Sequence, residues 1–205
     1  MLKKIVFAVI AVTIVITGCS LFNFGGGDLM PLTVGNYWNM KINMKTTIAA
    51  HTTTSISYGR SEITGKVTLG NGKESFSYKT GVADSVYNFD TVYVNTTYFI
   101  KEDTAYFSYD SLNQATGDYQ GPVTVDIGTV WNANSMKFEV TAKEDVTVPA
   151  GTFKNAYKIA MTTTTSDTMW QWIAQGKGSV KSYFKAGDSS YSMETTTELM
   201  DYEVK

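Results

Sequence analysis

Few side chains in this chain of 205 residues are suited to chemistry, because it contains one cysteine, Cys19, and one histidine, His51. A zinc site needs several Cys or His ligands, so the sequence predicts neither a metal nor a cofactor. A catalytic triad could use His51, but the chain has no Gly-x-Ser-x-Gly motif to provide the nucleophile. We therefore predict no catalytic residue and no enzymatic activity.

Cys19 closes the sequence Ile16-Thr17-Gly18-Cys19, and before it lie Lys3, Lys4 and an apolar run from Ile5 to Ile16. A basic start, a short apolar run and small residues before a cut are the parts of a secretory signal. The run is shorter than the ~20 residues that a membrane-spanning helix needs. A cysteine directly after the small residues resembles the bacterial lipobox, in which the thiol is acylated and the signal is cut just before it.

These features divide the chain into three predicted parts. Residues 1–18 are a lipoprotein signal peptide with a signal helix, residues 19–29 are the acylated Cys19 and a flexible glycine-rich tether, and residues 30–205 are one β-rich domain. Each buried CH₂ of an acyl chain such as palmitate contributes ~0.8 kcal/mol, so several chains hold a protein on a membrane stably. Ser20 is not the aspartate that favours inner-membrane retention in enteric bacteria, which predicts the outer membrane, facing the periplasm or the outside.

The charge balance argues against nucleic acid as a partner. The chain has 17 Lys and Arg against 19 Asp and Glu, and loss of Lys3 and Lys4 with the signal takes the formal net charge from -2 to -4. The mature chain is mildly acidic and its sequence shows no basic patch. Acylation of the only thiol also leaves no disulfide, so packing and backbone pairing must stabilise the fold.

The pattern of residue types predicts an all-β fold. Thr, Tyr, Val and Phe are abundant, and Trp38, Met40, Ile42 and Met44 alternate with polar residues as in a half-buried antiparallel strand. Turn signals such as Gly70-Asn71-Gly72-Lys73 separate the runs. We expect consecutive antiparallel hairpins in a strongly curved sheet or incomplete barrel, with a β-sandwich as the alternative. The predicted strands are 38–44, 54–69, 75–79, 82–87, 91–100, 104–109, 153–165, 168–175, 180–185 and 191–202, with a loop at 110–121. Residues 135–148 are expected to form one strand or a bent pair of strands.

Two short segments echo one another. Val34–Asn39 and Ile127–Asn132 share a β-branched residue, a Gly, a Trp and an Asn in the same order. The match indicates either two sub-sheets that begin alike or a coincidence of turn chemistry.

Three further segments resemble exported bacterial lipoproteins of unassigned function. These are Pro31-Leu32 with Gly35-Asn36 and Trp38, then Val146–Phe153, and then Trp170–Ala174 followed by Gly176–Lys181. The resemblance implies an antiparallel sheet, curved as in the LolA/LolB-like folds. It implies no catalytic residues.

The tryptophans are the candidate binding residues. Trp170 and Trp172 share one strand face and belong either to the core or, with Trp38 and Trp131, to the wall of a ligand groove. If Trp170 and Trp172 line a cavity, a carrier of apolar ligands is favoured. If they are closely packed in the core, a structural scaffold is favoured.

We predict a non-enzymatic, membrane-anchored lipoprotein of the bacterial envelope. Its β-domain is expected to bind a lipid or other apolar ligand, or a partner envelope protein. A structural scaffold is the alternative. A hydrolase of envelope polymers is the third hypothesis, and it lacks the convergent polar cluster that it would need.

Overall fold

The computed structural model describes residues 30–49, 51–83, 93–163, 168–188 and 190–205. These residues form β-strands and turns, and none of them forms a helix long and apolar enough to cross a membrane. The strands are β1 (Tyr37–Ile48), β2 (His51–Thr68), β3 (Glu74–Ala83), β4 (Tyr93–Glu102), β5 (Ala105–Tyr109), β6 (Asp118–Pro122), β7 (Val130–Ala133), β8 (Met136–Val148), β9 (Gly151–Thr162), β10 (Thr168–Ala174), β11 (Gly178–Gly187) and β12 (Tyr191–Glu203).

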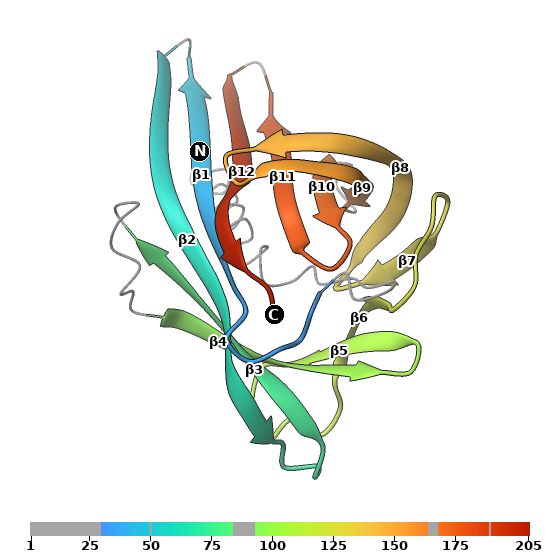
Figure 1. The fold of residues 1–205 in the computed structure, drawn as a ribbon. Helices are drawn as coiled ribbons and strands as arrows, with labels where there is room; N and C mark the ends of the chain where they lie inside the picture. Colours follow the sequence, from blue (N-terminus) through green and yellow to red (C-terminus); the bar gives the residue numbers. More distant parts are fainter. Residues whose placement is uncertain (1–29, 50, 84–92, 164–167, 189) are drawn as a thin grey trace.

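All twelve strands belong to one antiparallel sheet, in the order β6-β5-β4-β3-β2-β1-β12-β11-β10-β9-β8-β7. Apart from β6 and β7, consecutive strands pair as hairpins, and the long ladder between β1 and β12 joins the first and last strands. The sheet curls so far that it forms a nearly closed barrel (Figure 1). This confirms the predicted all-β, strongly curved sheet, and the chain does not adopt the alternative of two stacked sheets.

The barrel is incomplete between its edge strands β6 and β7, which close upon one another without a ladder among the described strands. A buried side chain joins them instead. Gln120 of β6 donates from Nε2 to Ser108 Oγ at 2.7 Å, and its Oε1 accepts from Asn134 Nδ2 at 3.1 Å. The hydrogen bond from Asn134, directly after β7, to Gln120 therefore crosses the seam that backbone pairing leaves open.

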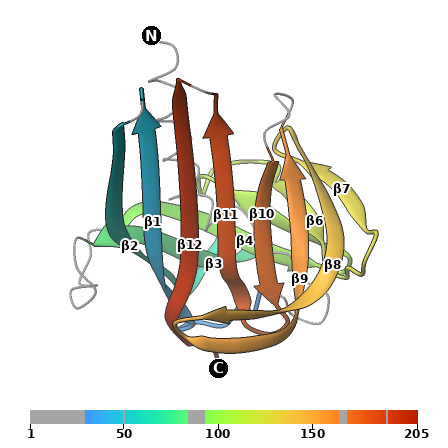
Figure 2. The same ribbon diagram turned by 90° about the horizontal axis from the view of Figure 1, so that it is seen from above.

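One wall of the barrel consists of β1, β12, β11, β10 and β9 side by side (Figure 2). At its lower end, near the C-terminus, β8 and β9 bend around the barrel. Two bulges in their ladder allow the bend, at Val140/Ala142 and at Glu144/Val146. The far part of this hairpin thus folds back toward β12 and β11.

Two large groups of buried side chains fill the sheet's curve. We name the first the methionine cluster and the second the motif cluster, since the latter contains residues from all three lipoprotein-like segments. The methionine cluster contains Ile42, Val125, Trp131, Ala133, Phe138, Val140, Tyr157, Ile159, Met161, Met169, Ile173, Phe184 and Met193, with Met44, Met136, Ala186 and Tyr191 packed against it. The motif cluster contains Met30, Trp38, Met40, Ile63, Tyr78, Phe99, Val146, Val148, Ala156, Ala174, Val180 and Leu199, with Leu32, Phe76, Ala150, Phe153, Trp172, Tyr202 and Val204 packed against it.

Most predicted strands match observed ones, with differences at three places. One is β7 (Val130–Ala133), which lies in none of the predicted strands. The loop predicted at 110–121 ends early, because β6 begins at Asp118 and pairs with β5. The strands predicted at 75–79 and 82–87 are one strand, β3, as far as Ala83, and the rest of 82–87 lies outside the described residues.

The echo between Val34–Asn39 and Ile127–Asn132 corresponds to the same turn made twice. Gly35 has a φ of +91° and donates to Ile63 O at 2.8 Å, while Ile63 N donates to Asn36 O. Gly128 has a φ of +88° and donates to Val140 O at 2.8 Å, while Val140 N donates to Thr129 O. Positive φ favours glycine at both positions. Each turn leads into a strand whose second residue is a tryptophan, within a single sheet.

Candidate functional site

The three lipoprotein-like segments meet at the end of the barrel where β8 and β9 bend. Trp38 of β1 donates its indole N–H to the carbonyl of Lys177, in the β10–β11 turn, at 2.5 Å. The turn between β8 and β9 reaches β12, where Ala150 N donates to Leu199 O at 3.0 Å. The motif cluster closes this end of the barrel, so the segments have a structural role in the fold.

Polar groups of this end have protein partners. Asn36 is fully buried, donates from Nδ2 to Pro31 O at 2.7 Å, and accepts at Oδ1 from the backbone N–H of Lys205 at 3.0 Å. One side chain therefore ties the beginning of the described domain to its last residue. A buried amide satisfied in this way stabilises the fold instead of serving a ligand.

A shallow surface groove of about 320 Å³ lies outside the motif cluster, between the β8–β9 and β10–β11 turns. Its cations already have partners. Lys177 Nζ lies 5.5 Å from the ring centroid of Tyr202, and Lys154 Nζ lies 2.5 Å from Asp145 Oδ2. On the aspartate, the hydrogen bond from Lys154 and a second from the backbone of Asn155 lower the pKa of Asp145. The groove is a charged, solvated surface.

The structure does not bring the four candidate tryptophans together. Trp38 is buried in the motif cluster, and Trp131 is buried in the methionine cluster, where it stacks on Phe138 with centroids 5.2 Å apart. Trp170 and Trp172 alternate with residues of the methionine cluster and so face the outside of β10.

On the outside of β10 the two tryptophans meet charged side chains. Lys158 Nζ lies 5.0 Å from the ring centroid of Trp170 and 5.3 Å from that of Trp172. The indole of Trp172 also donates to Glu144 Oε1 at 2.6 Å. Both rings are half-buried, and their polar and cationic contacts lie within the protein. Trp172 also packs against the motif cluster, whereas neither ring belongs to the methionine cluster.

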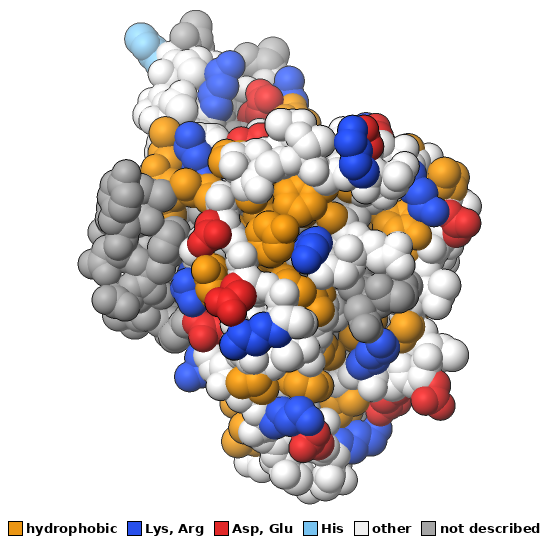
Figure 3. Space-filling model, viewed as in Figure 1, with side chains coloured by type: hydrophobic (Ala, Val, Ile, Leu, Met, Phe, Trp, Pro, Cys, Tyr) orange, Lys and Arg blue, Asp and Glu red, His pale blue; other side chains and the backbone are white. Residues whose placement is uncertain are grey.

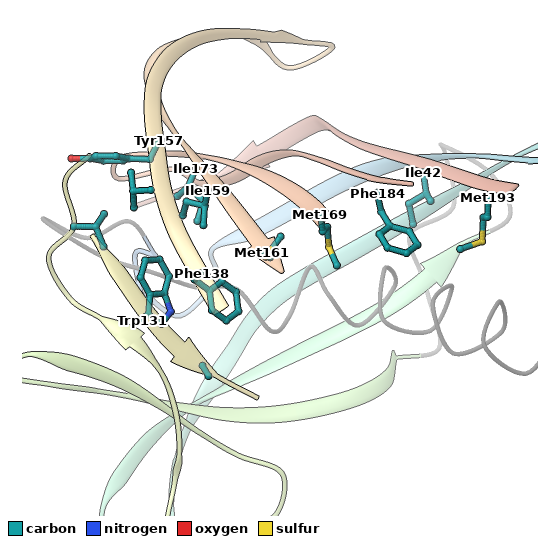
Figure 4. Close-up of a cluster of buried hydrophobic side chains, with 13 residues drawn as sticks. Ile42, Trp131, Phe138, Tyr157, Ile159, Met161, Met169, Ile173, Phe184 and Met193 are labelled. Carbon is teal, nitrogen blue, oxygen red and sulfur yellow. The ribbon is translucent and has the colours of Figure 1, made fainter. Parts of the chain in front are cut away.

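The methionine cluster occupies the inner face of the wall. Strand register places Phe184, Met169, Met161 and Phe138 in one row across β11, β10, β9 and β8. Figure 4 shows the labelled side chains of this cluster projecting from the sheet, with methionine beside aromatic rings. Methionine side chains are unbranched and polarisable, which lets such a surface adapt to the shape of an apolar ligand.

The next row on the same face is polar. Gln171, Ser182 and Thr197 are Cα partners across β10, β11 and β12, and Thr195 is paired with Phe184 one row away. We name these four residues the polar stripe. Gln171, Thr195 and Thr197 have exposed fractions of 1%, 3% and 0%, whereas Ser182 is half-buried. Apolar side chains of the same face surround them.

Three polar atoms of the stripe have no hydrogen-bond partner among the described residues: Gln171 Oε1, Thr195 Oγ1 and Thr197 Oγ1. Gln171 Nε2, by contrast, donates to Ser179 Oγ at 2.9 Å. Leaving a buried polar group unsatisfied costs about 1–3 kcal/mol, so native structures contain few of them. Three together in one small area require an explanation, which makes the polar stripe the candidate binding site.

The charged residues of the same strands lie on the other face. Lys181 of β11 and Glu198 of β12 are paired across the ladder, with Lys181 Nζ 3.3 Å from Glu198 Oε1. Basic and acidic side chains are interspersed over the molecular face shown in Figure 3. The polar stripe is therefore an uncharged site in an apolar inner face.

The remaining predicted residues contribute no reactive centre to this site. His51 is exposed at the start of β2, opposite Ile48. Among the described residues, no group of three or more His, Cys, Asp or Glu could hold a metal ion. Cys19 lies outside the described residues and stays a prediction.

Sequence reasoning missed the polar stripe. Its signal was the pattern of β12, in which Thr195 and Thr197 share a face with Met193 and Leu199. Polar residues on an otherwise apolar strand face were present in the sequence. Threonine is also an ordinary strand residue, so its presence there attracted no functional interpretation.

No family model matches the chain, and no curated protein matches it. Several solved structures match it, among them the following three. A protein assigned as a lipoprotein from Parabacteroides distasonis is 17% identical over 85% of this chain and 98% of that chain, with a TM-score of 0.44. A protein assigned as exported, with a YmcC-like fold, from Bacteroides fragilis is 13% identical over 89% of this chain and 99% of that chain, with a TM-score of 0.45.

The third is a LolA superfamily protein from Nitrosomonas europaea, which is 8% identical over 87% of this chain and 90% of that chain, with a TM-score of 0.25. All three TM-scores lie below 0.5, so we draw no functional conclusion from these likenesses.

Proposed function

We propose that this protein is a non-enzymatic lipoprotein of the bacterial envelope whose β-domain binds an apolar ligand on the inner face of the barrel. The observation that carries the proposal is the polar stripe, where three buried polar atoms lack a protein partner within an apolar, methionine-rich surface. A ligand with a long apolar part would cover the methionine cluster. A polar group on that ligand would reach the stripe.

The predicted lipid anchor would place the ligand-binding domain at a membrane. Acylated Cys19 and the tether 19–29 would hold domain 30–205 at the surface of the membrane, which we propose to be the outer membrane. A domain held there is close to a supply of lipids. Replacing Cys19 with Ala should release the protein from the membrane fraction, and retention of normal processing and membrane binding would contradict the anchor.

The binding proposal is tested with an apolar fluorescent probe, N-phenyl-1-naphthylamine. The full-length chain is expressed, and its processed product is purified and held in an amphipathic polymer. It is titrated with the probe, and the polymer alone is the control. Ala186 lies at the margin of the methionine cluster, paired with Met193, so Ala186→Trp should fill the inner face. We expect this variant to bind the probe at least about tenfold more weakly.

The matched control is Ala160→Trp, which adds the same bulk on the outer face of β9, opposite Trp170. This variant should bind the probe as the unmodified protein does. Failure of the unmodified protein to bind, or equal binding by the two tryptophan variants, would contradict a site on the inner face.

A further inference from the structure

We propose that the polar stripe selects a neutral amphiphile: one acyl chain and an uncharged head group with at least two hydrogen-bonding groups, one of them a donor, as in a monoacylglycerol. This inference rests on the proposed function and names its ligand class. Four features of the inner face lead to it: its unpaired acceptor, its lack of charge, its width and its position between the two clusters.

The acceptor is the amide oxygen of Gln171. Its Nε2 already donates to Ser179 Oγ at 2.9 Å, which fixes the amide and leaves Oε1 without a partner. A carbonyl oxygen only accepts hydrogen bonds, so the ligand must bring an O–H or N–H to this atom. The hydroxyls of Thr195 and Thr197 can donate or accept, so they suit a hydroxyl or an ester oxygen.

A charged head group does not fit this site. The ladder neighbours of the stripe on the inner face are apolar, among them Ile42, Ile159 and Phe184. The charged ladder pair of the same strands, Lys181 with Glu198, lies on the other face and is already joined at 3.3 Å. A carboxylate or phosphate placed at the stripe would be buried without a counter-ion, which is strongly unfavourable.

The width of the stripe sets the size of the head group. Gln171 and Thr197 are each Cα partners of Ser182, so they are two strand spacings apart. Two spacings are about 10 Å, and the Gln171 side chain reaches over part of that distance. A glycerol unit with several oxygens spans what remains better than a single hydroxyl does.

The position of the polar stripe determines the direction in which the acyl chain of the ligand extends. Along β12 the inner face runs from Met193 through Thr195 and Thr197 to Leu199, which belongs to the motif cluster. That end of the barrel is closed, so the acyl chain must extend toward Met193. The half-buried side chains of Met44 and Ala186 lie in that direction. The head group is thus the deepest part of the bound ligand.

The test compares three ligands that share one C12 acyl chain. Monolauroylglycerol has hydroxyl donors, methyl laurate is neutral with acceptors only, and laurate is charged at neutral pH. Each displaces N-phenyl-1-naphthylamine from the full-length protein in an amphipathic polymer, with polymer-only controls. We expect monolauroylglycerol to bind about tenfold more tightly than methyl laurate, and laurate to bind most weakly.

Variants assign the preference to named atoms. Gln171→Met keeps the volume and removes the acceptor, so it should abolish the advantage of monolauroylglycerol and leave methyl laurate within about twofold. Thr197→Val should weaken both neutral ligands, since its hydroxyl can donate to either. Thr196→Val is the matched control on the outer face of β12 and should change nothing.

The outcomes separate this inference from the proposed function. If none of the three ligands displaces the probe and the probe itself does not bind, the proposed function fails. If all three bind equally, or laurate binds most tightly, the site binds apolar chains but the neutral head-group inference is wrong. Loss of monolauroylglycerol preference in Thr196→Val, or its persistence in Gln171→Met, would also overturn the inference.

Discussion

The motif cluster and the methionine cluster are built from one sheet by the same alternation of side chains, yet their polar atoms differ. At the motif cluster, Trp38 and the nearby Asn36 each have a protein partner within hydrogen-bond distance. Beside the methionine cluster, Gln171, Thr195 and Thr197 each have a buried atom without one. Satisfied polar groups specify a fold, whereas unsatisfied ones in an ordered interior indicate a group supplied from outside.

The comparison also separates the recognisable sequence motifs from the proposed site. The Val-Pro-Ala-Gly-Thr-Phe turn and the Gly-Lys-Gly turn lie at the closed end, where backbone conformation is demanding. Gly151 has a φ of +130°, and Gly176 and Gly178 also have positive φ. The polar stripe lies in ordinary strand, where no special backbone is required. Motifs in this chain therefore mark the closure of the barrel, and the proposed binding site lies elsewhere.

The largest effect is expected from emptying the motif cluster. Phe99 has an exposed fraction of 0% and packs edge-on against Tyr78, with ring centroids 5.5 Å apart. Phe99→Ala should lower the free energy of unfolding by about 3–5 kcal/mol, through lost burial and the cavity that remains. Denaturant unfolding measures this change. The control is Ile56→Ala, at 51% exposure, which should change stability by no more than about 0.5 kcal/mol.

A loss below about 1 kcal/mol for Phe99→Ala would mean that this end relaxes around a cavity, contrary to the description of it as a closed core. Equal losses of unfolding free energy in Phe99→Ala and Ile56→Ala would also contradict the description of this end as a closed core.

A smaller effect of opposite sign is expected in the polar stripe. Thr197→Val replaces an unpartnered buried hydroxyl with a methyl group of similar size, so it should raise the free energy of unfolding of the ligand-free protein by about 1 kcal/mol. Ser179→Ala removes the partner of Gln171 Nε2 and should lower it by about 1–2 kcal/mol. Thermal or denaturant unfolding after delipidation compares the two. Destabilisation by Thr197→Val would show that the hydroxyl serves the fold.

The curved sheet of consecutive antiparallel strands could be predicted because local sequence patterns determine its strands and hairpins. Alternation such as Trp38, Met40 and Ile42 predicted β1, and glycine turns predicted hairpins at Gly70–Lys73 and Gly176–Gly178, which the structure confirms. A hairpin is determined by the residues of its own turn, so it can be predicted from a short stretch of sequence. The likeness of the two Trp-containing turns was visible for the same reason.

The missed features depend on contacts between distant residues. Strand β6 was hidden because its short, polar sequence pairs as a barrel edge, and the bend of β8 and β9 arises from bulges that no residue type announces. The polar stripe joins Gln171 to Thr197 through register across three strands. Such register is fixed by the whole sheet, so the sequence grouped the four tryptophans by type while the fold separated them.

We propose that the closed end stabilises the fold while the polar stripe holds a ligand. Native mass spectrometry tests it directly on full-length protein purified from membranes, alongside the Thr195→Val/Thr197→Val double variant and the outer-face Thr196→Val control. We expect the unmodified protein and the control to carry a neutral amphiphile of constant mass, and the double variant to be folded and to lack it. Recovery of the unmodified protein without a bound species, or equal occupancy of the double variant, would contradict the account.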